Sequence, residues 1–368
     1  MKYKTCPTIF TGKLILLIIC FVYELKSDEK DRGLPDFKLP GVDGQYYTQK
    51  DFENYRLTAV VFLSNHCRVS QLFQTQIIEI NKRVNNEEIA IFAVSPNYAP
   101  AILPDELAYS DLGDSYEEMK KRSVRLNYNF PYLYDGEKQA LTKLVGATIT
   151  PSVYIYNKQK KLIYAGRIGN HETVENINTS DLYNILKERE PYSSVSIMRK
   201  KVFGTSIKTK EDNFLAEQVR KRYANEKIRL VRADSRKLKF YANHLTRKPK
   251  LFYVWQVNDE NARENLIKLS SLYKIFRKRG LKLITVAIGE EKQREMIVEI
   301  LNQAQLSTTN FISRGHEIAP LLVLLPNTIE KTTPFYRLIS SDGKPLLGGH
   351  GDVKYDELRM EILRALND

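Results

Sequence analysis

The sequence is poor in the residues that form disulfides and metal sites. Its 368 residues include three cysteines, five histidines and one tryptophan. The cysteines, at positions 6, 20 and 67, are too far apart for a Cys-x-x-Cys pair. Cys67 and the adjacent His66 supply two ligands, whereas a structural zinc site generally takes four. We therefore expect no bound metal and no other cofactor.

Long apolar segments are also scarce. Residues 1–27 contain lysines followed by an apolar run over 14–23, which is the pattern of an export signal. A run of about ten residues is too short to cross a bilayer, which needs about twenty. We expect a cleaved signal peptide, with an N-terminal membrane anchor as the alternative, and a periplasmic or secreted protein. Cleavage would remove Cys6 and Cys20 and leave Cys67 as the only cysteine.

The chain is basic, with a formal charge of +13, but it has no nucleic-acid-binding motif. The lysines and arginines are spread along the sequence, which is typical of solvated surfaces. We expect no nucleic-acid partner. The length and the moderate apolar content suit a globular protein with two domains, each with a core of its own.

The most informative stretch surrounds Cys67. Residues 58–63 are an apolar run, which predicts a buried strand, and the apolar spacing beyond Cys67 predicts an amphipathic helix. Cys67 would then lie at a helix N-terminus, where free N–H groups and the helix dipole favour a thiolate. Arg68 and a protonated His66 would add positive charge, and the Ser64 hydroxyl could stabilise the anion. The alternative is a buried structural cysteine.

The segment Phe62–Cys67 resembles the Asn-His-Cys-Pro turn of peroxiredoxin-like redoxins, in the alkyl hydroperoxide reductase and thiol-specific antioxidant superfamily. Further stretches resemble the family in the same order: 34–44, 130–135, 146–151, 162–168 and 203–208. The resemblance covers about residues 33 to 210. It implies an α/β thioredoxin-like fold, with a central mixed β-sheet flanked by helices, and a thiol oxidoreductase or antioxidant function.

The resemblance also implies a substrate-binding segment. Thr150-Pro151 matches the loop whose proline is cis in thioredoxin-like folds and lies against the active-site cysteine. The backbone before this proline would be free to pair with a bound substrate strand. The alternative is an ordinary proline at the start of a strand. Arg167, in the strand-like stretch that follows, is a candidate to approach the sulfur and bind substrate, and otherwise is a surface charge.

The chain departs from the family at several positions. Ser64, Ile149 and Thr205 stand where relatives often carry cysteines, and Arg68 replaces a proline. Ser70 lies where a Cys-x-x-Cys motif would place its second sulfur. A cysteine without a partner thiol can be oxidised or form a mixed disulfide, but it cannot release a substrate through an intramolecular disulfide. We therefore expect an external thiol reductant.

The second half resembles a degenerate copy of the first. It has an apolar strand at 250–255, a helical pattern at 262–279 and a second strand at 281–288. Pro334 matches the cis-proline position, but 257–261 contains no thiol. A scaffold of this kind is either a binding module for an extended peptide or a support for the first domain.

We predict a signal segment at 1–27, a redoxin domain at 33–190, a linker with a family-like tail at 191–212, and a second thioredoxin-like domain at 213–368. The expected function is an exported thiol oxidoreductase with one reactive cysteine. Such a protein would be a one-cysteine peroxidase acting on peroxide, or would exchange disulfides with protein or small-molecule substrates. The alternative is a catalytically inactive redoxin-like binding or scaffold protein.

Overall fold

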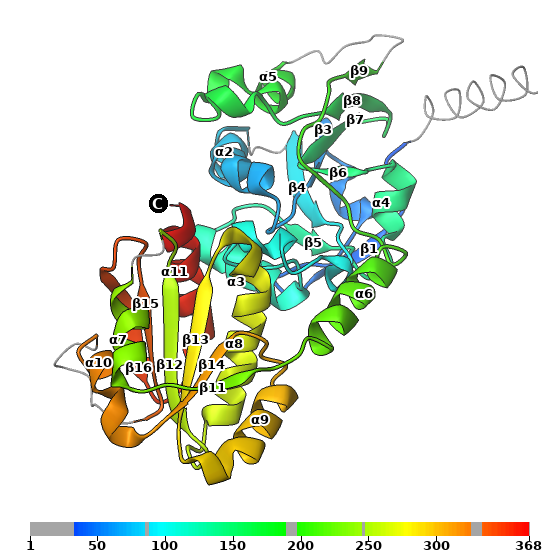
Figure 1. The fold of residues 1–368 in the computed structure, drawn as a ribbon. Helices are drawn as coiled ribbons and strands as arrows, with labels where there is room; N and C mark the ends of the chain where they lie inside the picture. Colours follow the sequence, from blue (N-terminus) through cyan, green and yellow to red (C-terminus); the bar gives the residue numbers. More distant parts are fainter. Residues whose placement is uncertain (1–32, 85–87, 189–196, 245–246, 325–332, 368) are drawn as a thin grey trace, which may run out of the picture. The chain divides into compact units, whose positions relative to one another are not determined.

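The computed structural model describes most of the chain (Figure 1), namely residues 33–84, 88–188, 197–244, 247–324 and 333–367. The predicted signal segment at 1–27 lies outside the described residues. Within the described part, no helix has the length and the apolar character needed to cross a membrane.

The chain divides into two compact units. Unit 1 contains the described residues up to Asn97 together with Tyr116–Ile207. Unit 2 contains Tyr98–Ser115 and the described residues from Lys208 onward. The boundary between Ile207 of unit 1 and Lys208 of unit 2 falls inside the predicted linker at 191–212. The family-like tail therefore belongs to unit 1 as far as Ile207.

Unit 1 is built on a six-stranded sheet with the strand order β5-β4-β3-β7-β8-β9. Its strands are β3 (Leu57–Phe62), β4 (Ile89–Ser95), β5 (Tyr132–Tyr134), β7 (Ser152–Asn157), β8 (Leu162–Gly166) and β9 (Met198–Arg199). Strands β3, β4 and β5 are parallel, and β7 and β8 form an antiparallel hairpin beside β3. Two small sheets pair β1 (Lys38–Pro40) with β2 (Tyr46–Thr48), and β6 (Ile149–Thr150) with β10 (Thr205–Ser206).

Helices cover both faces of this sheet, and this explains the composition of β3. One core contains side chains of α2 (Arg68–Val84), α3 (Tyr116–Leu126) and α5 (Asp181–Lys187), and the opposite core contains Leu141 of α4 (Ala140–Val145). Alternate residues of β3 enter the two cores, and all six are buried. A central strand that is buried on both faces reads as an unbroken apolar run, as the sequence analysis predicted.

Unit 2 has a second six-stranded sheet, in the order β11-β14-β13-β12-β15-β16. Its strands are β11 (Leu230–Arg232), β12 (Lys250–Gln256), β13 (Lys282–Ile288), β14 (Thr309–Ser313), β15 (Phe335–Ile339) and β16 (Pro345–His350). Its longer helices are α6 (Asn213–Ala224), α7 (Ser235–Asn243), α8 (Ala262–Phe276), α9 (Arg294–Gln303) and α11 (Tyr355–Asn367), with the short α10 (Ala319–Leu322). One core contains side chains of α8, α9 and α11, and the other contains side chains of α7 and α10.

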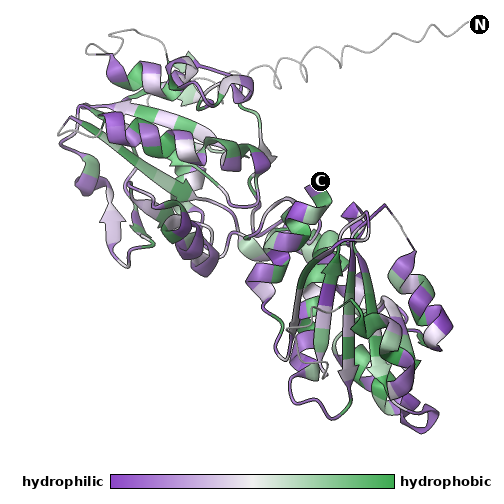
Figure 2. Cartoon of the chain, turned by 90° about the vertical axis from the view of Figure 1, so that its left-hand side faces the viewer, coloured by the Kyte–Doolittle hydropathy of each residue, from purple (hydrophilic) through white to green (hydrophobic). Residues whose placement is uncertain are grey.

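The two sheets have matching topology, and each unit has the predicted α/β architecture of a central mixed sheet flanked by helices. In each, a central strand has parallel neighbours on one side and an antiparallel hairpin on the other: β3 in unit 1 and β12 in unit 2. The Thr150–Pro151 and Thr333–Pro334 bonds are both cis, as expected. Figure 2 shows the central strands of both sheets as largely hydrophobic and the helices as mixed in colour, as expected for sheets buried between helical layers.

The sequence did not predict that Tyr98–Ser115 belongs to unit 2. Ala108 is fully buried in a unit 2 core, and its carbonyl accepts a hydrogen bond from Arg279 Nη1 at 2.7 Å. Lys278 pairs with Asp105 at 2.8 Å. The segment interrupts the first domain between β4 and α3, and its packing partners come from far along the chain.

The buried Asn265 of α8 joins this helix to the loop before α11. Its side chain donates to the Gly351 carbonyl (2.9 Å) and accepts from the Val353 N–H (2.8 Å). Replacing Asn265 with alanine leaves both backbone groups without this partner. Because unpaired buried groups cost about 1–3 kcal/mol, we expect Asn265→Ala to lower the free energy of unfolding of unit 2 by about 2 kcal/mol.

Trp255, the only tryptophan, is fully buried in a unit 2 core, so its fluorescence in a urea titration reports on this unit. Arg263→Ala, on the exposed side of α8, is the control and should change stability by no more than about 0.5 kcal/mol. Equal midpoints for the two variants would contradict a stabilising role of the Asn265 bridge.

Candidate functional site

Cys67 lies in the turn that connects β3 to α2. The strand ends at Phe62 and the helix begins at Arg68, so the cysteine directly precedes the first helical residue. The thiol is completely buried. Arg68, which stands where the redoxin family that the sequence resembles has a proline, is exposed. It is the first residue of α2, so Cys67 still lies directly before the helix.

The Cys67 sulfur has hydrogen-bonding groups around it. In its protonated form the thiol donates to the Thr150 carbonyl, with Sγ 3.0 Å from the oxygen. The Ser70 N–H donates to Sγ at 3.4 Å, and hydrogen bonds from Thr205 also reach the sulfur. Burial raises the pKa of the thiol, but the hydrogen bonds from Thr205 and Ser70 outweigh it, and the pKa is lowered.

Thr150 has a second contact in the site. Its hydroxyl lies 2.8 Å from the Ser64 hydroxyl, and both residues are fully buried. Pro151, which follows Thr150, is also buried. The structure therefore brings Ser64, Cys67, Thr150 and Pro151 together, and the Ser64 hydroxyl, which the sequence placed toward the sulfur, is bonded to Thr150.

The remaining wall of the site is β10. Thr205 and Ser206 pair antiparallel with Thr150 and Ile149. From the sequence, Thr205 stands out only as a replacement for a cysteine, and it is not among the predicted site residues. The signal was the resemblance of 203–208 to the family's closing segment, but only the pairing with β6 places Thr205 at the sulfur.

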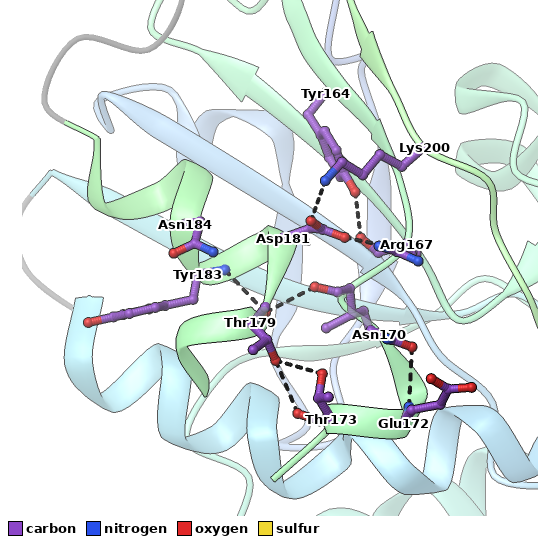
Figure 3. A network of polar contacts seen from close by, with 12 residues as sticks. Tyr164, Arg167, Asn170, Glu172, Thr173, Thr179, Asp181, Tyr183, Asn184 and Lys200 are labelled. Atoms are coloured by element: carbon purple, nitrogen blue, oxygen red, sulfur yellow. Dashed lines mark hydrogen bonds and ion pairs between the residues drawn. The ribbon is translucent and has the colours of Figure 1, made fainter. Parts of the chain in front are cut away.

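Two other predicted site residues have different surroundings. His66 is buried in the turn. Arg167 belongs to the polar network in Figure 3, where its Nε bonds Asp181 at 2.7 Å. Lys200 Nζ contacts the same carboxylate at 2.5 Å, and the Tyr164 hydroxyl donates to the Arg167 carbonyl at 2.6 Å. This network ties the end of β8 to α5, and a substrate-binding role of Arg167 stays a prediction.

The corresponding turn of unit 2 is polar and has no thiol. Asn261 directly precedes α8, as Cys67 precedes α2. Thr333, before the second cis-proline, accepts a hydrogen bond from Gln256 Nε2 at 2.8 Å and donates to Asp259 at 3.2 Å. Across the described ranges, no group of three or more His, Cys, Asp or Glu side chains is arranged to hold a metal ion.

Residues 31–165 match the family described as the AhpC/TSA family. Among solved structures, a hypothetical protein from Sinorhizobium meliloti 1021 is 23% identical, with a TM-score of 0.41, and the match covers 49% of this chain and 93% of that chain. An uncharacterized conserved protein from Geobacillus kaustophilus is 28% identical, with a TM-score of 0.40, and the match covers 49% of this chain and 92% of that chain.

The C-terminal domain of a putative thiol-disulfide oxidoreductase from Bacteroides thetaiotaomicron is 14% identical, with a TM-score of 0.32, and the match covers 43% of this chain and 98% of that chain. No curated protein matches the sequence.

The side-chain hydroxyl of Ser70 is one of the groups whose hydrogen bonds lower the pKa of Cys67. We expect Ser70→Ala to raise the pKa, because one of the hydrogen bonds that favour the thiolate is lost. The pKa can be measured from the β-carbon chemical shift of labelled cysteine during a pH titration, in a chain carrying Cys6→Ser and Cys20→Ser.

The matched control is Thr75→Ala, which removes a hydroxyl from the exposed side of the same helix. It should leave the titration of Cys67 unchanged. An unchanged pKa in Ser70→Ala would show that the Ser70 hydroxyl does not favour the thiolate.

Proposed function

Because residues 31–165 carry an AhpC/TSA family domain, we propose that this protein is a thiol oxidoreductase in which Cys67 alone exchanges disulfides through a mixed disulfide. The observation that carries the proposal is the set of hydrogen bonds from Ser70 and Thr205 to the Cys67 sulfur at a strand-to-helix turn. These donors favour the thiolate, which is the form that attacks a disulfide.

The exchange consists of two displacements. The Cys67 thiolate attacks one sulfur of a partner disulfide, and the partner S–S bond breaks as the bond to Cys67 forms. The other partner sulfur leaves as a thiolate and takes a proton from water. An external low-molecular-weight thiol, as its thiolate, then attacks the partner sulfur of the mixed disulfide, which releases the Cys67 thiolate and a new disulfide.

The surroundings of the sulfur favour exchange over peroxide reduction. The Thr150 carbonyl lies 3.0 Å from Sγ, and a polypeptide strand, β10, pairs beside it. A site walled by backbone that pairs with a strand suits a polypeptide partner. Ser64 holds the Thr150 hydroxyl, so in this arrangement it supports the wall of the site.

We place the protein outside the cytoplasm, in the periplasm or secreted, on the basis of the signal-like segment at 1–27. An oxidising compartment suits a protein whose single remaining thiol exchanges disulfides with other molecules.

Unit 2 is proposed to be a binding module that lacks redox chemistry. A polar cleft of about 390 Å³ lies at the carboxyl ends of β12, β13 and β14, and it is lined in part by Gln256, Arg314 and His316. Ligands of open α/β sheets bind at this end of the strands. The cleft, together with the contacts of Gln256 and Asp259 with Thr333, supports the predicted binding of a peptide.

The proposal is tested with oxidised glutathione and the full chain carrying Cys6→Ser and Cys20→Ser, here called the single-cysteine chain. We expect Cys67 to gain one glutathione by mass spectrometry and an added thiol to remove it. Cys67→Ser should show no adduct. Since the pKa of Cys67 is lowered, the reaction should persist at a pH where an ordinary cysteine, with a pKa of about 8.5, is mostly protonated.

A parallel reaction with hydrogen peroxide, followed by dimedone trapping, separates the two chemistries. Rapid sulfenic acid formation without glutathione exchange would replace the proposal by a one-cysteine peroxidase. If Cys67 of the folded protein reacts with neither oxidant, while the unfolded protein reacts at the rate of free cysteine, the inactive binding protein would be the function.

A further inference from the structure

The buried state of Cys67 has an identifiable cause in the described part of the chain. Thr205 of β10 pairs with Thr150 of β6, and the Thr150 carbonyl oxygen lies 3.0 Å from the Cys67 sulfur. The Ile207 N–H continues the pairing by donating to the Thr148 carbonyl at 2.9 Å. Strand β10 therefore lies over the thiol, between Cys67 and any partner that approaches along β6.

The backbone of this cover approaches β6 closely. A Cβ atom added at Gly204 would lie 1.9 Å from the Thr150 carbonyl oxygen and 3.0 Å from the Pro151 ring. No side chain fits at this distance, so the pairing requires glycine at position 204. The contact is thus made by backbone against backbone, beside the sulfur.

The cover is also held weakly. Strand β10 has two residues, and β6 pairs with no other strand in the described ranges. Phe203, Gly204 and Ser206 are exposed, and the segment is anchored by the buried Ile207. A short strand with exposed neighbours and few buried contacts belongs to the part of a structure that opens at low free energy.

Opening would leave the backbone groups of Ile149 and Thr150 without their strand partner. Such an edge accepts an incoming extended segment through main-chain hydrogen bonds. The residue of the incoming segment that takes the place of Thr205 would then face the Cys67 sulfur. The groove is therefore suited to a strand with a small residue at that position, preceded by glycine.

We propose that β10 is an intramolecular occupant of the partner groove, and that the partner of Cys67 is an extended polypeptide strand with a cysteine in the place of Thr205. The inference rests on the proposed exchange function of Cys67. In the closed state shown by this structure, β10 excludes partners from the thiol. In the open state, the incoming strand pairs with β6, and the disulfide of its cysteine is attacked by Cys67.

The first test releases β10 with Gly204→Val in the single-cysteine chain. Because the closed pairing cannot contain the valine side chain, we expect iodoacetamide to alkylate Cys67 at least roughly tenfold faster. The matched control is Gly315→Val, where an added Cβ meets its nearest neighbour at an ordinary 3.8 Å. The control should react at the parent rate, and an unchanged rate in Gly204→Val would overturn the proposal.

A second variant covers the case in which Gly204→Val fails to fold. Thr205→Cys in the single-cysteine chain places a second thiol against the sulfur. With oxidised glutathione, the two protein thiols should lose two hydrogens and form a disulfide, while glutathione disulfide is reduced to two molecules of glutathione. Ser206→Cys, on the neighbouring exposed position, is the control and should yield glutathione adducts. Equal bridging by both variants would contradict the assigned place of Thr205.

The partner class is tested with a synthetic peptide of residues 201–208 that carries cysteine in place of Thr205, activated as a disulfide with an aromatic thiol. It should form a mixed disulfide with Cys67 faster in Gly204→Val than in the single-cysteine parent. A peptide with the same residues in scrambled order should show no such gain, and equal rates for the two peptides would overturn the strand-shaped partner.

The outcomes also separate this inference from the proposed function. Fast alkylation of Cys67 in Gly204→Val, without exchange with oxidised glutathione, would refute the exchange function while showing that β10 covers the thiol. Exchange at the same rate in Gly204→Val and in the parent would support the function and refute the cover.

Discussion

The site depends on the position of the Thr150 backbone. Its carbonyl faces the Cys67 thiol, its hydroxyl holds Ser64, and its main chain pairs with Thr205. One residue therefore connects the strand-to-helix turn, the segment before the cis-proline and the tail of the domain. A shift of Thr150 would change the hydrogen bonding of the sulfur and the fit of β10 at once.

The electrostatics of Cys67 follow from two opposed effects. Burial removes water and disfavours the thiolate, whereas hydrogen bonds from Ser70 and Thr205 favour it. Thr205 belongs to β10, so the strand that covers the thiol also stabilises its anion. Displacement of β10 by a partner would remove this donor, which links access to the thiol with the chemistry of the thiol.

The two units show how the same scaffold can keep or lose redox chemistry. Both have a central strand, a turn before a helix, and a threonine followed by a cis-proline. In unit 1 the residue before the helix is Cys67, and in unit 2 it is Asn261. Gln256 and Asp259 hold Thr333 in unit 2, so the polar contacts at this point of the fold remain although the thiol is absent.

The sequence by itself determined the elements whose pattern is local. The apolar run before Cys67 and the spacing after it predicted β3 and α2, and a second set of strands and helices predicted the tandem sheets. Local pattern failed where a strand is short or polar, as in β14, whose buried Asn310 bonds Thr285 of the neighbouring strand. Such a strand is stabilised in the sheet because a side chain of the neighbouring strand forms a hydrogen bond with its buried polar residue. Hydrophobic periodicity along the sequence gives no sign of this contact.

Only the tertiary structure decided what surrounds the thiol. Thr205 lies 138 positions after Cys67 in the sequence, and its place at the sulfur results from the pairing of β10 with β6. The inclusion of Tyr98–Ser115 in unit 2 is likewise a matter of long-range packing around Ala108. Both arrangements depend on contacts between distant segments, which residue spacing along the chain does not specify.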